Sequence, residues 1–536
     1  MAGARQEEMA EEIGHVACRM AGEIVSSAPP GWTRAVLSGH AGRWGTGLTG
    51  GYTVGGTRHA GRLPGLHGLL SELAEPVCEE RGWDRPSWEM DCLPSGEHRL
   101  VVFEETVGRV TGGLGGYQIV LDPACRLPQS GLSQESGTAA PAGDPETATA
   151  LFHTYLDRRA AVLGHREELP PPATIAALEE AERRIGRALP AELKALYLIA
   201  DGDAVGLGSR YLIDGYHWLP LDSLVHEHAE GRESPWHGWD LEWDSVVFDA
   251  TPADTVRRCG GHPDWIRFAS GEDGNYLAVD LAPARHGHPG QIIVTGRDYH
   301  HEGPAYVADS LTSLLREHID LLESGTHAYE HDKADDGTAH LYLLRDHRRD
   351  YGTRQIIGRI PDEVPHTLQA IHINDAAEPV DLSPLTAAPG LRRLHLNRSV
   401  TADLTPVREL PVESLRVGLV GGDLTPLAGH PHLAALDLRT TAPADVTPLR
   451  DLPRLHGLDL EGADVPDLTA LAGLPHLRYL ALDQRQWAVL LRDDTLPPGL
   501  AAARLAGPDV TFEDALTLAS RLGLDTGSAL RAAGTL

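Results

Sequence analysis

Histidine is abundant in this sequence, and its 28 residues raise the possibility of a metal site. The close pairs are His226 with His228, His286 with His288, and His300 with His301. The spacing of the first pair cannot place two imidazoles on one helical turn, and the other two pairs lie in polar loops without a clear third ligand. We therefore expect surface histidines, no metal site and no cofactor.

Two further motifs contain reactive residues without the context that chemistry needs. Gly45, Gly47 and Gly50 form a Gly-x-Gly-x-x-Gly motif, but a dinucleotide site needs a strand before it and a helix after it, and neither is evident. Cys259 follows two arginines that could lower the pKa of its thiol, although a loop cysteine without a function is the simpler interpretation. No nucleophile elbow and no P-loop occur. We predict no catalytic residues and no enzymatic activity.

An acidic, tryptophan-rich run at 236–249 is the first candidate for binding. Its relevant residues are Trp236, Trp239, Asp240, Glu242 and Asp244. Aromatic anchors beside acids are typical of a contact point for a basic protein partner. The alternative is that the tryptophans belong to a core and the acids are solvated.

Acidic residues outnumber basic ones by 77 to 46, which gives the 536 residues a net charge of −31. This charge argues against nucleic acid and anionic membranes as partners. The first residues form no signal sequence, and no run of about 18 apolar residues occurs. Five scattered cysteines without a Cys-x-x-Cys pair fit a reducing compartment. We expect a cytoplasmic protein that binds another protein.

The positions of these candidates depend on the elements around them, and the length suggests roughly three to five domains. We predict a multidomain α+β protein whose C-terminal part is a repeat solenoid. The expected parts are an α+β domain at 1–128, a linker at 129–150, a second α+β domain at 151–325, a linker at 326–362 with one strand at 341–344, repeats at 363–510, and a capping helix at 511–536.

The N-terminal segment should alternate helices and strands. Apolar residues at helical spacing predict an amphipathic helix over 6–26 and a second helix over 66–73. The glycine-rich stretch 37–61 should hold turns and short strands. Further strands are predicted at 98–105 and 117–122. With the PPGW sequence at 29–32, this order resembles the YezG-like immunity proteins of bacteria.

The middle segment should contain two helices followed by strands. Thr174 can cap the first helix, Pro190 suits the start of the second, and Asp201-Gly202 ends it. Strands are predicted at 211–213, 245–248, 265–269, 276–281 and 291–296, and a closing helix at 307–323.

The amino-acid sequence of this segment resembles that of the SMI1/KNR4 (SUKH) family. The matching phrases are TIAALEEAERRIGRALPAELKALYLIADG (174–202), WIRFASGEDGNYLAVDLAP (265–283) and GQIIV (290–294). The resemblance implies a binding module and not an enzyme. Bacterial members are immunity proteins that neutralise a cognate toxin, often a basic nuclease, whereas fungal members suggest a regulatory scaffold. The insert 226–244 departs from the family pattern and is a possible recognition surface.

A repeat of 21 to 23 residues begins near Pro365. Its units read L-x-x-L-x-L, as in LRRLHL (391–396) and LAALDL (433–438), and several continue with an Asp-Leu-Thr-Pro turn. This pattern resembles the leucine-rich repeats of internalin-like proteins and implies a horseshoe of the α/β type. The asparagine expected after the second leucine pair is mostly absent. Thr511 followed by Asp514 predicts a helix that caps the last coil.

The repeat spacing also predicts which side chains face the concave side. One row is His372, His395, Arg416, Asp437, Asp459 and Ala481, and the next is Asn374, Asn397, Gly418, Arg439, Glu461 and Asp483. The charge of this face drifts from neutral or basic to acidic along the solenoid. We expect the charged members of both rows and His395 to bind a protein partner, the alternative being solvent positions without a partner.

The preferred hypothesis is a non-enzymatic immunity protein that neutralises a cognate, basic toxin, because an acidic chain attracts cationic partners. The alternative is a regulatory scaffold with leucine-rich repeats that acts in cell-wall or morphogenesis signalling. A hydrolase hidden in the N-terminal domain would require an acid, a base and a nucleophile gathered in one cleft.

Overall fold

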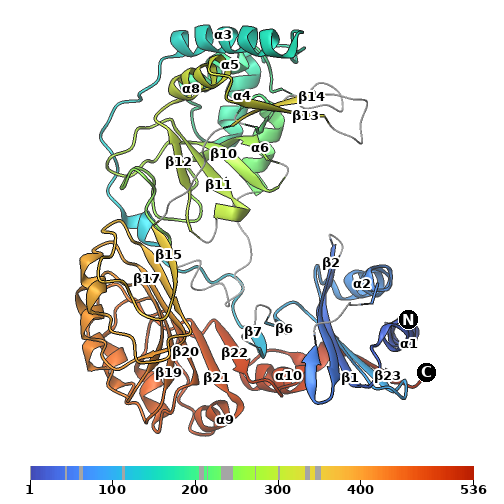
Figure 1. Cartoon of the computed structure of the whole chain (residues 1–536). Coiled ribbons are helices and arrows are strands. Elements are labelled where there is room, and N and C mark those ends of the chain that lie inside the picture. Colours follow the sequence, from blue (N-terminus) through green and yellow to red (C-terminus); the bar gives the residue numbers. More distant parts are fainter. Residues whose placement is uncertain are drawn as a thin grey trace.

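The computed structural model contains a repeat solenoid with one domain at each of its ends (Figure 1). The structure describes residues 2–42, 45–59, 64–110, 115–203, 211–213, 215–230, 246–271, 273–299, 302–331, 339–344 and 352–536. The middle domain packs beside the first coils, and the N-terminal domain joins the last ones.

The N-terminal domain is a six-stranded antiparallel sheet with two helices on one face. Its elements are α1 (Ala2–Ser27), β1 (Trp32–Gly42), β2 (Gly45–Val54), β3 (Thr57–His59), α2 (His67–Arg81), β4 (Ser87–Cys92) and β5 (His98–Phe103). The order is β23-β5-β4-β1-β2-β3, where β23 (Leu530–Gly534) comes from the C-terminal segment. Both predicted helices and the strand over 98–105 are present.

The glycine-rich stretch forms one long hairpin of β1 and β2, so the prediction of turns and short strands over 37–61 was wrong. Glycine allows these strands to approach closely. A Cβ atom at Gly50 would lie 2.3 Å from the carbonyl oxygen of Val36. The predicted strand over 117–122 exists as β7 (Tyr117–Val120), but with β6 (Val107–Arg109) it joins the solenoid sheet instead of the N-terminal one.

The middle domain packs helices against a five-stranded antiparallel sheet of order β12-β11-β10-β9-β8. The helices are α3 (Pro145–Leu163), α4 (Ile175–Ile185), α5 (Ala191–Tyr197), α6 (Leu221–Glu230) and α8 (Leu311–Glu323), with short turns η1 (Ser130–Ser133) and η2 (Arg297–Tyr299). The strands are β8 (His217–Trp218), β9 (Trp265–Ser270), β10 (Asn275–Asp280), β11 (Gln291–Gly296) and β12 (Ala305–Ala308). As predicted, the Thr174 hydroxyl caps α4 by accepting a hydrogen bond from the amide of Ala177.

Several predictions for this region were wrong, including the strand over 211–213, of which only Ile213 forms an isolated bridge with Tyr216. Residues 245–248 are not a strand where the structure describes them, because Val246 and Phe248 pack against the solenoid instead. The expected linker 129–150 contains η1 and the first turns of α3, which Asp144 caps. The expected linker 326–362 contains β13 (His327–His331), β14 (Ala339–Leu343) and β15 (Thr353–Ile357), and Leu341 is buried in the core of the middle domain.

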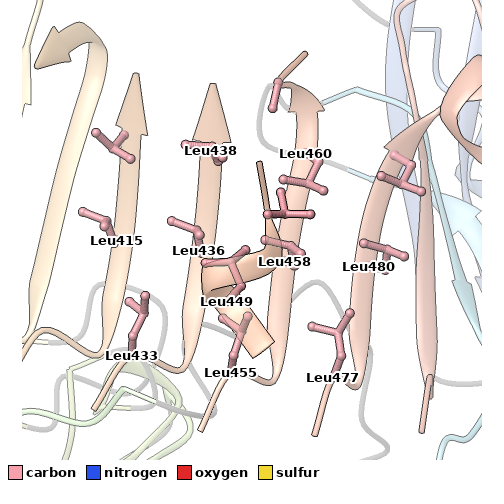
Figure 2. Close-up of a cluster of buried hydrophobic side chains, with 14 of the residues drawn as sticks. Leu415, Leu433, Leu436, Leu438, Leu449, Leu455, Leu458, Leu460, Leu477 and Leu480 are labelled. Atoms are coloured by element: carbon pink, nitrogen blue, oxygen red, sulfur yellow. The ribbon is translucent and has the colours of Figure 1, made fainter. Parts of the chain in front are cut away.

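The solenoid is a ten-stranded sheet of order β15-β16-β17-β18-β19-β20-β21-β22-β7-β6, parallel from β15 to β22. Its further strands are β16 (Ala370–Asn374), β17 (Arg393–Thr401), β18 (Ser414–Leu419), β19 (Ala435–Thr440), β20 (Gly457–Gly462), β21 (Tyr479–Asp483) and β22 (Ala502–Ala506). Leucines of successive coils stack in one continuous core (Figure 2). No single coil could bury them alone, which explains the repeat.

The outer side of the solenoid consists of short turns and one helix. They are η3 (Ser383–Ala387), η4 (Thr405–Glu409), η5 (Thr425–Leu427), η6 (Thr447–Asp451), η7 (Leu468–Gly473) and α9 (Gln484–Arg492). An aspartate starts each of the five turns: the Asp403 carboxylate, for example, accepts a hydrogen bond of 2.8 Å from the amide of Thr405. An aspartate followed two residues later by Ser or Thr therefore encodes these turns.

The C-terminal segment does more than cap the solenoid. Thr511 and Asp514 form the predicted capping box of α10 (Phe512–Arg521), and Phe512 stacks on Tyr117 of β7. The helix ends at Arg521, however, so the prediction of a capping helix over 511–536 was too long. The turn η8 (Thr526–Ser528) leads into β23, which pairs with β5 of the N-terminal sheet. The domains at the two ends of the sequence are therefore interlocked.

Candidate functional site

The strand register places the predicted concave residues in one row. His372, His395, Arg416, Asp437, Asp459 and Ala481 are direct neighbours on consecutive strands, and Arg504 of β22 continues the row. The leucines between these positions point into the core. We call this row, together with Asn374, Asn397, Arg439, Glu461 and Asp483 beside it, the concave strip.

Ion pairs tie together the charged residues of the concave strip other than Asp483, which caps α9 by accepting a hydrogen bond from the Gln486 amide. Arg416 Nε lies 2.9 Å from Asp437 Oδ2, and Arg439 Nε lies 3.8 Å from Asp437 Oδ1. Arg439 has 55% of its side chain exposed, compared with 30% for Arg416 and 14% for Asp437. The pairs hold the side chains in fixed positions, and the outermost guanidinium remains accessible to a partner.

Arg504 is the important residue that the sequence prediction missed. Its side chain is fully buried, and Nη2 lies 2.9 Å from Asp459 Oδ2 and 2.7 Å from Glu461 Oε2. It therefore neutralises part of the acidic end of the strip from within the chain. Arg504 stands at the same offset from Leu500 as Asp459 from Leu455, so extending the repeat by one unit identifies it.

Burial changes the titration of the acidic end. Desolvation raises the pKa of Asp459 to about 6, although the nearby Arg504 favours the carboxylate. Burial also raises the pKa of the Tyr479 phenol beside it. The acidic end therefore carries less charge near pH 6 than the sequence implies.

The first half of the strip is neutral and hydrogen-bonded. The ring of His395 is buried edge-to-face against His372, and its Nε2 lies 3.0 Å from the Ser414 hydroxyl. The Asn397 amide donates a hydrogen bond of 3.0 Å to the Asn374 side chain. These residues form a short asparagine ladder of two members.

Other parts of the chain cover one edge of the concave side. Cys125 and Leu127 pack on Ala501 and Ala502, and Phe248 lies against Arg393 with its ring centroid 4.8 Å from the guanidinium carbon. The row that contains Arg393 is therefore occupied from within the chain. The concave strip lies beside this covered row on the same side of the solenoid. The sequence alone did not show which of the two rows would be covered.

A buried ion pair joins the middle domain to the solenoid. Arg258 Nη2 lies 2.6 and 2.8 Å from the two carboxylate oxygens of Glu413, and Arg392 Nη1 lies 3.2 Å from Glu413 Oε1. Glu413 is almost fully buried, and burial together with Arg258 lowers the pKa of Arg392. The Asp249 amide and carbonyl also bond to the Gln369 side chain.

The remaining sequence candidates are placed as follows. Trp236, Trp239, Asp240, Glu242 and Asp244 lie outside the described residues, as do His300 and His301. The glycine motif lies within the β1–β2 hairpin. Cys259 is buried, which raises the pKa of its thiol to about 12.

Within the described ranges, no group of three or more histidine, cysteine, aspartate or glutamate residues is arranged to hold a metal ion. Within the same ranges, no helix has both the length and the apolar character needed to cross a membrane.

Comparison with known proteins identifies the middle domain. Residues 172–317 match the SMI1 / KNR4 family (SUKH-1), and the chain therefore contains an SMI1/KNR4 domain. KNR4/SMI1 homolog 2 of Debaryomyces hansenii is 26% identical over 220 residues, which are 35% of this chain and 37% of that protein. The cell wall biosynthesis/cell cycle regulator smi1 of Schizosaccharomyces pombe is 27% identical over 24% of this chain and 26% of its own.

Other similarities are shorter or weaker. The glucan synthesis regulatory protein of Neurospora crassa is 49% identical over 51 residues, or 10% of each chain. This chain thus spans 37% or less of the length of these relatives. Internalin C2 of Listeria monocytogenes is a structural neighbour with 26% identity, covering 22% of this chain and 52% of that one with a TM-score of 0.20.

Proposed function

We propose that this chain, which contains an SMI1/KNR4 domain at 172–317, is a non-enzymatic protein-binding protein and acts as an immunity protein against a basic toxin. The observation that carries the proposal is the concave strip, whose charged side chains are held in place before a partner arrives. Prearranged charges favour a complementary partner and reject others. The cysteine pattern of the sequence supports a cytoplasmic site of action.

The mechanism that we propose is steric. The acidic chain attracts a cationic toxin domain, since a net charge of −31 accelerates association with basic partners. The SMI1/KNR4 domain covers the active site of the toxin, and the concave strip adds contacts. Arg258, Glu413 and Arg392 join the SMI1/KNR4 domain to the solenoid. The domain and the solenoid therefore meet the partner as one rigid unit.

Co-purification of the full chain from its native host tests the proposal. We expect the tagged chain to retain a basic protein with toxin activity. We also expect that protein, once purified, to lose its activity when this chain is added. Asp437→Asn should weaken retention about tenfold or more, because it removes an acid of the strip and the ion-pair partner of both Arg416 and Arg439. Glu180→Gln on the exposed surface of α4 is the matched control. A chain that retains no protein would refute the proposal.

A regulatory scaffold is the second candidate, and the names of the fungal relatives favour it. These proteins are called a glucan synthesis regulator and a cell wall biosynthesis/cell cycle regulator. The two candidates differ in their gene neighbourhood. A toxin gene beside the gene for this chain supports immunity, and a neighbourhood of cell-wall genes without one supports the scaffold.

A further inference from the structure

The N-terminal sheet has one face that its own helices do not cover. Helices α1 and α2 pack on the face that contains Leu37, Trp88 and Leu100. On the opposite face, β6 and α10 cover the region around Val101 and Phe103, and β6 also contacts β1 and β4, where Ser38 and Glu89 are buried.

The uncovered face is basic although the chain is acidic. The six strands of the sheet carry four arginines and two acids, Glu89 and Asp91, and the strand register places all six on this face. We call it the arginine face; its arginines are Arg34, Arg58, Arg99 and Arg531. Over the whole sequence the ratio is reversed, with 77 acids against 46 bases.

The arginines are only partly neutralised by the chain. Arg34 Nη2 lies 2.6 Å from Asp91 Oδ2, whereas Arg99 and Arg531 share a single carboxylate, that of Glu513, at 2.5 and 2.8 Å. These three side chains are still between 42% and 54% exposed. Guanidinium groups of this kind can accept a second carboxylate.

Arg58 has no carboxylate partner among the described residues. Its Nη2 donates a hydrogen bond of 3.0 Å to the Val36 carbonyl oxygen, so the side chain crosses the sheet from β3 to β1. Burial and the nearby Arg109 lower the pKa of Arg58, and Arg34 acts in the same direction. Arg58 therefore lies near two further guanidinium groups and near the Glu89 carboxylate, which favours the charged form.

A second observation on this face is an unused hydroxyl group. Ser38 is 1% exposed and lies between Glu89 of β4 and Thr49 of β2. Its Oγ forms no hydrogen bond within the described part of the chain. At 1% exposure this hydroxyl is closed off by the chain itself, so it belongs to the covered part of the face and the accessible part is that of the arginines.

We propose that the arginine face binds an acidic segment of a partner protein. The arginines extend from β23 to β3, and six strands about 4.8 Å apart span roughly 24 Å, which is too wide for one small anion. Asp91 and Glu513 already occupy this face, so the arginines are spaced to receive carboxylates. This site is separate from the concave strip and has the opposite charge preference.

A peptide titration tests the proposal with the full chain. The probe is fluorescein-labelled octaglutamate, followed by anisotropy at about 0.1 M salt, where the Debye length of about 10 Å screens distant acids. We expect saturable binding that weakens about fivefold in Arg58→Gln and is retained in Arg58→Lys. Arg183→Gln, which removes an exposed arginine of α4, should leave binding unchanged. Thermal melting verifies that each variant folds.

Several outcomes would overturn the proposal. They are the absence of saturable binding, an equal loss in Arg58→Gln and Arg183→Gln, displacement of the probe by equimolar inorganic phosphate, and tighter binding of a ten-nucleotide thymidine strand. Phosphate displacement would indicate a small-anion site, and the thymidine result a nucleic-acid site. Failure here leaves the proposed function unaffected, because Asp437→Asn reports on the concave strip alone.

Discussion

At the scale of single residues, buried charges are the groups whose removal has the largest expected effect. Arg504 is the clearest case, because it is fully buried and pairs with two acids. Arg504→Met leaves Asp459 and Glu461 without their cation, and we expect the free energy of unfolding to fall by about 3–5 kcal/mol. Urea unfolding measures the loss. Arg439→Gln, which removes an exposed member of the same strip, should cost less than about 1 kcal/mol, and equal losses would contradict the assignment.

Asp280 gives a prediction about pH. Its carboxylate is buried and accepts hydrogen bonds from the Gln291 side chain and the Ala282 amide, and desolvation raises its pKa to about 6. The folded state therefore binds this proton more tightly than the unfolded state, whose pKa is near 3.9. The resulting stability is present below pH 4 and is lost as the pH rises through 6.

The difference in unfolding free energy between the native chain and Asp280→Asn isolates this contribution. We expect native minus variant to fall by up to about 3 kcal/mol between pH 4 and pH 7. Asp381→Asn is a control with the opposite sign, because hydrogen bonds from Ser383 lower the pKa of Asp381. For this variant, the unfolding free energy of the native chain minus that of the variant should rise with pH. A flat Asp280 curve would show that this carboxyl group is not desolvated.

At the scale of elements, the sequence predicted what is periodic or capped and missed what depends on distant partners. The leucine period identified the coils, and Thr174 and Thr511 identified the starts of α4 and α10. β23 has the sequence LRAAG, which has no strand pattern of its own and becomes a strand only because β5 offers an unpaired edge. Asp144 and Pro145 are typical of a helix start and do begin α3. The residues before them have the composition of a linker, so the helix start was not predicted.

The same contrast applies to the candidate sites. The concave strip follows from repeat spacing, whereas its ion pairs and the chain that covers its edge require the folded structure. The arginine face was invisible in the sequence because its four arginines are scattered over the two ends of the chain.

Removal of β23 tests the interlock between the ends. A chain that stops at Leu524 loses the β5 partner and the Arg531–Glu513 ion pair. We expect amide hydrogen exchange in β5 and α1 to accelerate at least tenfold, because both contact β23. Deletion of residues 535–536 alone is the control and should leave this exchange nearly unchanged. Equal protection in both chains would show that the N-terminal sheet is complete without β23.

At the scale of the whole molecule, Glu413 holds the middle domain in a fixed position on the solenoid. Glu413→Gln leaves Arg258 and Arg392 buried without their carboxylate at the contact between the middle domain and the solenoid. We expect an increased radius of gyration in small-angle X-ray scattering, with the secondary structure unchanged. Glu409→Gln, at an exposed position of a nearby turn, should scatter like the native chain. If both variants scatter alike, the other contacts suffice to hold the domains.

The pairing of β23 with β5 also has a consequence for synthesis on the ribosome. Arg99 and Glu513, which meet in this interlock, are 414 residues apart in the chain. At about 5–20 residues per second, roughly 20 to 80 seconds pass between their translation. During this interval the nascent N-terminal sheet has an open β5 edge, which is a target for chaperones and for pairing with other nascent chains. We expect ribosome-bound chains that lack β23 to be more sensitive to protease at β5 than released chains.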